Sequence, residues 1–208
     1  MADASQGFST VEDRVYDHFS RWNKRGVWAA ALNEINQLHR KNGRKPTPSY
    51  GIIDSQSVKT QYASEERGFD GHKKVKGHKR HIVVDILGNL LHVRVHAANH
   101  SDTIAATSIL QEAAMAYPTI QAFSGDCGYR GTAEAFVRRK LKLTLHIAQK
   151  PATEPGQFKI QPKRWIVERT FAWLGHFRRL AKDFEKRVST SENIIRIAML
   201  KLTVAKCV

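Results

Sequence analysis

The sequence predicts an α/β fold, in which a mixed sheet is flanked by helices and preceded by a short helical segment. Three observations support this prediction. The chain has 208 residues, of which 41% are hydrophobic, and a chain of this size can bury a substantial core. Apolar runs with strand periodicity alternate with segments of helical periodicity. The expected order is three strands, then helix, strand, helix, strand and two helices, which is typical of helices covering a sheet.

Residues 9–42 show helical periodicity in two stretches that Gly26 separates. These helices are too short for a separate stable domain. We therefore divide the chain into a helical segment at 1–45 and an α/β domain at 46–208, joined through a linker rich in turn residues at 43–50.

The first predicted strand is Ile52-Ile53-Asp54, a short apolar run that ends in an acid. Residues 60–78 are polar and contain three glycines, so they predict a loop. A hairpin is predicted over residues 80–97, because strand-like runs flank Gly88-Asn89, where positive backbone dihedrals are easily adopted.

The second half of the chain alternates helices and strands. The predicted elements are a helix at 102–117, a strand at 120–123, a helix at 132–140, a strand at 143–147, a proline-containing loop at 149–163, and helices at 165–177 and 191–207.

The charge balance is strongly basic. Lys and Arg number 34 against 19 acids, which gives a net charge of +15. Residues 73–80 hold five basic residues and no acid, and residues 138–187 hold 14 basic residues and 4 acids. Neutralisation of phosphates is the usual source of sequence-independent affinity for nucleic acid, so we expect a polyanionic partner. A basic but otherwise ordinary protein is the alternative.

Several classes of protein are disfavoured. Cys127 and Cys207 are the two cysteines, which cannot form a disulfide framework or a cysteine-based zinc site, and a reducing cytoplasm fits them. No apolar run is long enough to span a membrane. Among the ten histidines, His72, His78 and His81 lack the spacing of a structural zinc site, so phosphate contacts or exposed hairpin positions are favoured for them.

Two aspartates stand where apolar strands end. Asp54 closes the first strand, and Asp126 follows another strand between two glycines. Phosphoryl transfer between DNA strands can use two hard cations held by carboxylates, one to activate the nucleophile and one to stabilise the leaving oxygen. Each aspartate alone is equally compatible with a solvent-facing strand end or a plain Gly-Asp turn.

Glu168 lies on the predicted helix at 165–177, which has a broad apolar stripe. It shares a face with Arg164, Ala172 and Gly175, and the small residues leave room for a sheet edge, a metal or DNA. The alternative is a surface ion pair between Arg164 and Glu168, worth only tenths of a kcal/mol.

Four longer motifs stand in order along the chain. They are Asp-Ser-Gln-Ser-Val-Lys (54–59), Lys-Gly-His-Lys-Arg-His (76–81), Gly-Asp-Cys-Gly-Tyr-Arg-Gly (125–131) and Arg-Trp-Ile-Val-Glu-Arg-Thr-Phe-Ala-Trp-Leu (164–174). Together they resemble the motifs of one family, the insertion-sequence-five group of DDE transposases. The similarity continues through residues 178–185 and the last helix, and covers about residues 15–205.

This resemblance implies a ribonuclease-H-like fold, with which the order of elements above agrees. It implies that Asp54, Asp126 and Glu168 are both the catalytic residues and the ligands of two Mg²⁺ ions, with Mn²⁺ as a substitute. The expected enzyme is a DNA transposase, a metal-dependent polynucleotidyl transferase and endonuclease. It would cleave a strand at the end of an insertion sequence and join the freed 3′-hydroxyl to target DNA.

The expected partners are double-stranded DNA at the element ends and at the target, and further copies of the chain in a homo-oligomer on DNA. The expected location is the bacterial cytoplasm, in association with the nucleoid. The basic residues that we expect to contact phosphates are Lys59, Lys73, Lys74, Lys76, Lys79, Arg80, Arg164, Arg169, Arg178 and Arg179.

The chain departs from the family pattern in two respects. In the signature Y-x2-R-x3-E-x6-K, the tyrosine position is Gln161 and the lysine position is Gly175, so Arg178 or Arg179 is expected to take over a phosphate contact. The family also has a longer helical N-terminal region. We therefore interpret residues 1–45 as a helical remnant of an N-terminal DNA-binding region, with an upstream-frame polypeptide as a candidate partner.

Two other functions stay open. The first is a truncated, non-catalytic DNA-binding relic that competes at the element ends. The second is a basic RNA-binding module, which is weaker because no strand is rich in the aromatic residues that stack on bases.

Overall fold

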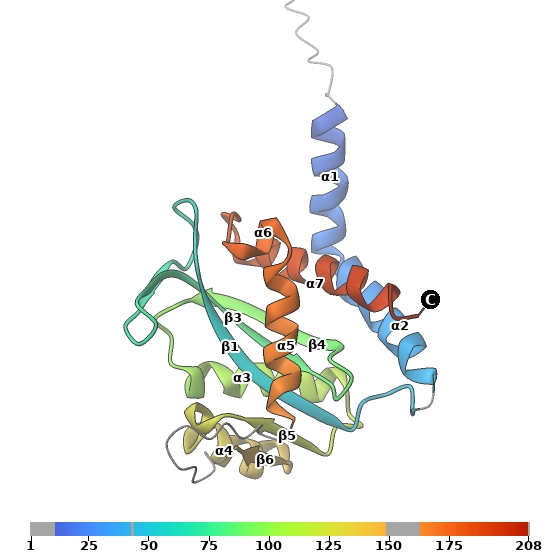
Figure 1. The fold of residues 1–208 in the computed structure, drawn as a ribbon, viewed down its shortest axis with the longest axis vertical. Coiled ribbons are helices and arrows are strands. Elements are labelled where there is room, and N and C mark those ends of the chain that lie inside the picture. The colour runs from blue at the N-terminus through green and yellow to red at the C-terminus, as the bar shows by residue number, and fades with distance from the viewer. Residues whose placement is uncertain (1–10, 43, 149–162, 208) are drawn as a thin grey trace, which may run out of the picture.

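The computed structural model describes residues 11–42, 44–148 and 163–207. A curled sheet with helices on both of its faces forms the body, and one helix projects from it (Figure 1). The strands are β1 (Tyr50–Lys59), β2 (Gly68–Asp70), β3 (Val75–Val84), β4 (Leu90–Ala97), β5 (Ala122–Gly125) and β6 (Thr144–Ile147).

The described strands form a single six-stranded sheet in the order β2-β3-β1-β5-β6, with β4 also paired to β3. Strands β1, β3 and β4 are antiparallel, and β5 and β6 run parallel to β1. Without the short β2, this is the order β4-β3-β1-β5-β6 of a ribonuclease-H-like sheet. The predicted fold class, a mixed sheet flanked by helices, is confirmed.

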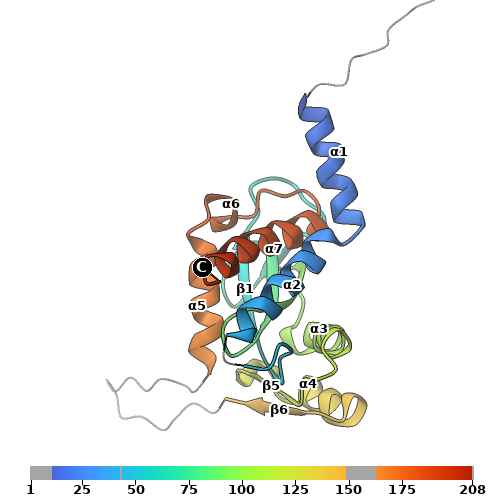
Figure 2. The ribbon, with the colours of Figure 1, turned by 90° about the vertical axis from the view of Figure 1, so that its right-hand side faces the viewer.

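The helices form two layers. The α3 and α4 helices cover one face of the sheet, while α5 and α7 cover the other, with α2 packed on α7 (Figures 1 and 2). The helical elements are α1 (Val11–Lys24), α2 (Val27–Lys41), α3 (Asp102–Ala116), the 3₁₀ turn η1 (Cys127–Tyr129), α4 (Thr132–Phe136), the π-helical turn η2 (Val137–Leu141), α5 (Arg164–Gly175), α6 (Arg178–Ala181) and α7 (Val188–Val204).

The alternation of side chains along β1 divides the core into two clusters. Ile52 packs in the cluster that contains Val167 of α5, and Ile53 packs in the cluster that contains Ile109 of α3. Since successive strand residues point to opposite faces, Asp54 is on the same face as Ile52. The strand therefore places Asp54 on the face that α5 covers.

The α2 helix is tied to the turn of the β3–β4 hairpin. Arg40 forms a buried ion pair with Asp85, and Asn36 Nδ2 donates to the Leu90 carbonyl at 2.9 Å. Asp85 also accepts backbone hydrogen bonds within the turn, at 2.8 Å from Leu87 and 2.9 Å from Asn89. By contrast, α1 buries none of its residues against the described part of the chain.

The main difference from the predicted elements is at β1 and the segment after it. The predicted strand at 52–54 is only part of a ten-residue strand, and Asp54 is within it rather than at its end. The predicted loop at 60–78 is wrong over β2 and the start of β3. Polar strand residues hide this pairing: Ser57, for example, donates to Asp70 at 2.5 Å.

The other predicted elements are present, with ends shifted by a few residues. The hairpin turns at Gly88, whose φ is +81°. The short helix predicted at 132–140 is α4 continued by η2. The predicted loop at 149–163, with Gln161, lies outside the described residues except for Lys163. None of the described helices is long and apolar enough to cross a membrane.

Candidate active site

Asp54 and Asp126 lie level with each other on neighbouring parallel segments. Ile52 of β1 pairs with Ser124 of β5, and each aspartate is two residues further along its strand direction. Equal offsets from a paired position bring both residues to the same height of the sheet and the same face. A small cavity between them is lined by both aspartates and by Arg164. The structure therefore brings together the first two predicted acids.

The turn after β5 fixes the second of these carboxylates. Asp126 caps η1, and its Oδ1 accepts a hydrogen bond from the Gly128 amide at 2.8 Å. Gly125 is required just before it, because a Cβ there would stand 2.7 Å from the Tyr129 ring and 3.1 Å from the Ile53 side chain. The motif thus packs Tyr129 into the core cluster on the α3 face of the sheet and leaves Asp126 on the face that α5 covers.

Asp54 has an unusual electrostatic environment. Burial raises the pKa of its carboxyl from 3.8 to about 6, and the negative charge of Asp126 acts in the same direction. A 2.7 Å hydrogen bond from the Ser55 amide and the positive charges of Arg164 and Lys73 partly oppose this rise in pKa. The negative charge of Asp54 is therefore only partly compensated in the folded chain, as expected where a cation would bind.

Glu168 is connected to the aspartates through Arg164. The apolar stripe of α5 is buried against the sheet, and Glu168 is on the outer part of the helix with 53% of its side chain exposed. Arg164 Nε lies 2.9 Å from Glu168 Oε1, and Arg164 Nη2 lies 3.9 Å from Asp126 Oδ2. The surface ion pair that the sequence left open is present, and it points toward the acidic pair.

The structure does not assemble all three acids around one point. Within the described ranges, no group of three or more His, Cys, Asp or Glu side chains could hold a metal ion. The guanidinium of Arg164 stands within ion-pair distance of Asp126 and Glu168, where it takes the place of a shared cation. Asp54 and Asp126 still fit a hard divalent cation, because they are adjacent oxygen donors beside a small cavity.

Most of the basic residues expected to contact phosphates are exposed. Lys73 extends from the segment between β2 and β3 toward β1, and its Nζ donates to the Ser55 carbonyl at 3.2 Å. Arg179 is exposed but paired with Glu185 at 2.6 Å. The remaining exposed members are Lys59, Lys74, Lys76 and Arg178, and Arg164 is partly buried.

Arg169 has a different environment from the other arginines. It stacks between two tryptophans, 4.6 Å from the ring centre of Trp165 and 4.4 Å from that of Trp173. Burial lowers the pKa of its guanidinium. Its Nη2 lies 3.4 Å from the Leu87 carbonyl, so it holds α5 to the hairpin turn.

The basic run at 73–80 is exposed only in its first part. Lys79 is buried, with Nζ 2.9 Å from Asp102, and Arg80 is buried, with Nη1 donating to the Leu180 carbonyl at 2.7 Å. His78 and His81 are fully buried as well, so the exposed positions expected for them are wrong. These four side chains stabilise the packing of β3 and are not on the surface.

Two residues beside the site were not singled out from the sequence. Tyr129 is fully buried, and burial together with Asp54, Asp102 and Asp126 raises the pKa of its phenol well above its ordinary value. It is within the motif at 125–131, but the motif alone does not show its burial. Lys163 places Nζ 3.9 Å above the Tyr50 ring, next to Arg164, and no pattern in the sequence indicated this contact.

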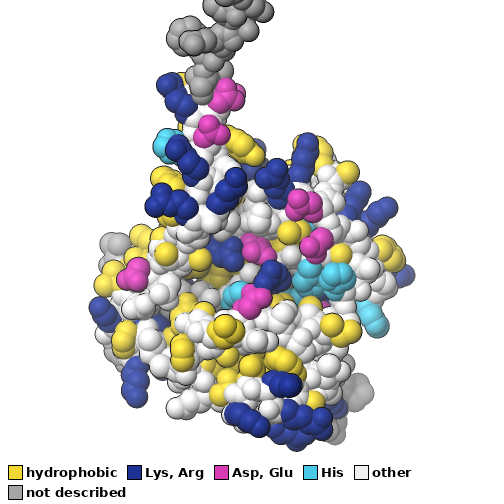
Figure 3. Space-filling model, turned by 180° about the vertical axis from the view of Figure 1, so that it is seen from behind, with side chains coloured by type: hydrophobic (Ala, Val, Ile, Leu, Met, Phe, Trp, Pro, Cys, Tyr) yellow, Lys and Arg dark blue, Asp and Glu magenta, His cyan; other side chains and the backbone are white. Residues whose placement is uncertain are grey.

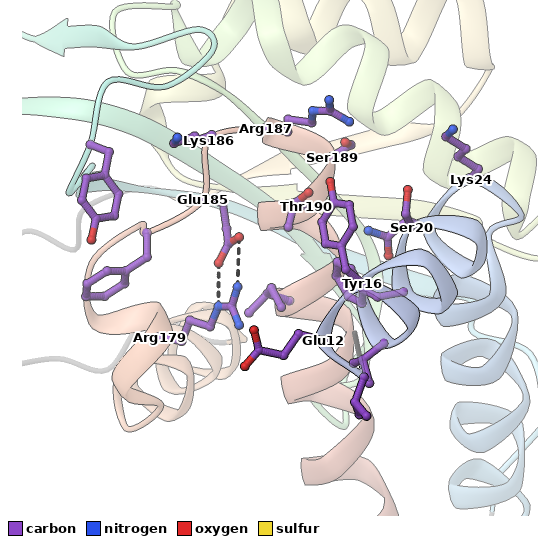
Figure 4. A pocket seen from close by; sticks show the side chains of 17 residues that line it. Glu12, Tyr16, Ser20, Lys24, Arg179, Glu185, Lys186, Arg187, Ser189 and Thr190 are labelled. Atoms are coloured by element: carbon purple, nitrogen blue, oxygen red, sulfur yellow. Dashed lines mark hydrogen bonds and ion pairs between the residues drawn. The ribbon is translucent and has the colours of Figure 1, made fainter. Parts of the chain in front are cut away.

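A larger groove is present away from the acids, between α1 and the segment at 184–194. Its volume is about 960 Å³, and Val15 and Tyr16 of α1 line it opposite Phe184. Figure 4 shows the groove, with the Arg179–Glu185 ion pair on its wall. None of the three predicted acids lines this groove.

A ribonuclease-H-like sheet that carries two level aspartates, with a helical glutamate across the same face, defines the DDE class of proteins. A family model described as "Transposase DDE domain" matches residues 45–201, which is most of the chain, so the chain belongs to this family. A protein of Burkholderia cepacia named "Putative transposase for insertion sequence element IS402" is 34% identical over 137 residues. The match covers 61% of this chain and 60% of that relative's length.

Proposed function

We propose that this chain is the catalytic domain of an insertion-sequence transposase, which cleaves and joins DNA strands with Asp54, Asp126 and Glu168. The observation that carries the proposal is the level placement of Asp54 and Asp126 on adjacent parallel segments, on the face of the sheet that α5 covers. Glu168 is on the exposed side of that helix. The family implies an enzyme that acts on the phosphodiester backbone of DNA.

Asp54 and Asp126 would hold a divalent cation, Mg²⁺ or Mn²⁺, and Glu168 would complete the set of ligands. Such a cation, when bound, supplies activation of the attacking oxygen and neutralisation of the charge that develops on the leaving oxygen. The aspartates come from rigid elements, β1 and the end of β5 capped by η1, so their positions are set before DNA binds. Glu168 is paired with Arg164 in the free protein, and we propose that it turns toward the aspartates when this ion pair opens.

Arg164 is the residue that we propose to change partners when DNA enters. Its guanidinium is shared between Asp126 and Glu168 in the free protein. A DNA phosphate is a strong bidentate acceptor for arginine, and would draw the guanidinium away from the carboxylates. DNA entry would thus release Glu168 and place a positive charge beside the phosphate in the same movement.

The DNA substrates would be the element ends and the target. The phosphate contacts that we retain are those of exposed or partly buried side chains near β1 and α5: Lys59, Lys73, Lys74, Lys76, Arg164 and Arg178. The Lys73 contact with the Ser55 carbonyl brings one of these positive charges next to Asp54. This proximity favours a DNA strand that passes over the acidic pair.

The test is strand cleavage by the purified chain, with a plasmid that carries the gene and its flanking DNA. Nicking in Mn²⁺ or Mg²⁺ by the native chain, with none by Asp126→Asn, would support the proposal. DNA binding without any nicking in either ion would favour the non-catalytic relic. Equal nicking by the native chain and the variant would exclude the assignment of Asp126.

A further inference from the structure

The π-helical turn η2 and the residue after it present a dense group of positive charges. Arg138, Arg139, Lys140 and Lys142 are all exposed, and together they form what we call the η2 basic patch. Within the described part of the chain, none of the four has an ion-pair partner. Four like charges within five residues repel one another, so an approaching anion lowers the electrostatic free energy of the patch.

The backbone holds this patch in an uncommon conformation. The η2 turn is π-helical. Such turns are rare in proteins, and those that occur are often found at functional sites. Lys142 has a φ of +57°, a left-handed conformation that non-glycine residues adopt uncommonly. Val137, fully buried in the cluster with Ala133 and Leu145, anchors the turn from below. The basic side chains thus project from a fixed support.

The patch is separate from the acids. The η2 turn packs on β6 and α3, on the face of the sheet opposite α5, and β6 is the outer strand beside β5. Figure 2 shows β6 at the lower edge of the sheet, with α4 beside it on the side away from α5, and Figure 3 shows Lys and Arg side chains gathered at the same lower end of the molecule. The patch and the two aspartates Asp54 and Asp126 are therefore on opposite faces of the sheet, near the same edge.

We propose that the η2 basic patch binds the phosphate backbone of duplex DNA at a second place, outside the active site and without sequence preference. Exposed Lys and Arg side chains on a short turn can neutralise phosphates but do not enter a groove as a recognition helix does. DNA held there and DNA held at the acids would flank the β5–β6 edge. Only the choice of DNA as the polyanion depends on the proposed function; the acids play no part in this binding.

The test compares two variants with the same loss of charge. The first is Arg138→Gln, Arg139→Gln and Lys140→Gln; the second, a matched control, is Lys182→Gln, Lys186→Gln and Lys201→Gln before and on α7, where all three side chains are exposed and have no proposed DNA contact. Binding of a random-sequence 30-bp duplex is measured by fluorescence anisotropy over a series of salt concentrations. Thermal melting of each variant checks that it is folded.

We expect the patch variant to reduce the slope of log affinity against log salt by about 2–3, since each phosphate contact contributes about 0.9. The control variant should reduce it by less than about 1. Equal slopes in the two variants, or an unchanged slope in the patch variant, would overturn the proposal. The same comparison in the Asp126→Asn background separates the patch from catalysis, because a wrong assignment of the acids leaves this difference in slope intact.

Discussion

The guanidinium Nε of Arg164 lies 2.9 Å from Oε1 of Glu168, one turn further along α5. An isolated pair of this spacing stabilises a helix by only a few tenths of a kcal/mol. Here the same guanidinium also lies 3.9 Å from Asp126, so it connects the helix to the acidic pair on the sheet. The arrangement suits a free protein whose third acid is held apart from the first two.

Arg164→Gln should separate stability from activity. Its exposed pair with Glu168 contributes little, so we expect the free energy of unfolding to change by less than about 0.5 kcal/mol. We expect strand nicking to fall by about tenfold or more, because a charge-assisted phosphate contact is worth about 1.5–3 kcal/mol. Urea unfolding and a nicking assay measure the two effects. Arg164→Lys is the control, and full activity in Arg164→Gln would rule out the phosphate role.

Asp54 should make stability depend on pH. Its carboxyl has an ordinary pKa of 3.8, and this pKa rises to about 6 in the folded chain. The folded state therefore holds the proton more tightly, and this stabilisation is complete below about pH 4 and is lost as the pH rises through 6. Asp54→Asn cannot ionise, so we expect it to be more stable than the native chain at pH 8 by about 1–3 kcal/mol.

Urea unfolding of the native chain and Asp54→Asn at a series of pH values measures this difference. The two free energies of unfolding should converge near pH 4 and separate between pH 4 and 7. Ser55→Ala, beside the acid but without a titrating group, serves as the control. Curves that stay parallel over the whole range would show that Asp54 has an ordinary pKa.

Local patterns in the sequence predicted much of the fold, and long-range partners explain what they did not predict. The β3–β4 hairpin and β5 were predicted because alternating apolar residues and a Gly-Asn turn are local signals. The extent of β1 was not, because Ser57 is satisfied by Asp70, thirteen residues away along the chain. Nor does any local pattern show that Lys79 and Arg80, at the end of a run of basic residues, are buried. Lys79 pairs with Asp102 of α3, and Arg80 donates to the Leu180 carbonyl of α6.

The candidate site was predicted in its parts but not in its arrangement. The acids were identified by type and by motif. The level placement of Asp54 and Asp126 depends on the register of β1 with β5, which the sequence does not specify. The Arg164–Glu168 pair follows from helical spacing, whereas the approach of Arg164 to Asp126 depends on how α5 crosses the sheet.

Asp126→Asn should remove cation binding and leave DNA binding intact. A ligand that binds only the folded state raises the melting temperature, so we expect Mn²⁺ to stabilise the native chain measurably and the variant much less. Differential scanning fluorimetry with Mn²⁺ or with EDTA measures this effect without any need for activity. Glu112→Gln, an acid of α3 on the opposite face, is the control. The same Mn²⁺ shift in Asp126→Asn as in the native chain would exclude Asp126 as a ligand.

The ion pair between Arg40 and Asp85 should be among the largest polar contributions to stability. Both side chains are buried, and Asp85 in addition holds the hairpin turn through the Leu87 and Asn89 amides. Removal of one member of a buried pair leaves an uncompensated charge, so we expect Arg40→Ala to lower the free energy of unfolding by about 3–5 kcal/mol. Arg44→Ala, an exposed arginine just beyond α2, should change it by less than about 0.5 kcal/mol. If Arg40→Ala unfolds at the same urea concentration as the native chain, this ion pair does not hold α2 to the sheet. The attachment of α2 would then have to come from the apolar contact of Leu32 with the core around α7.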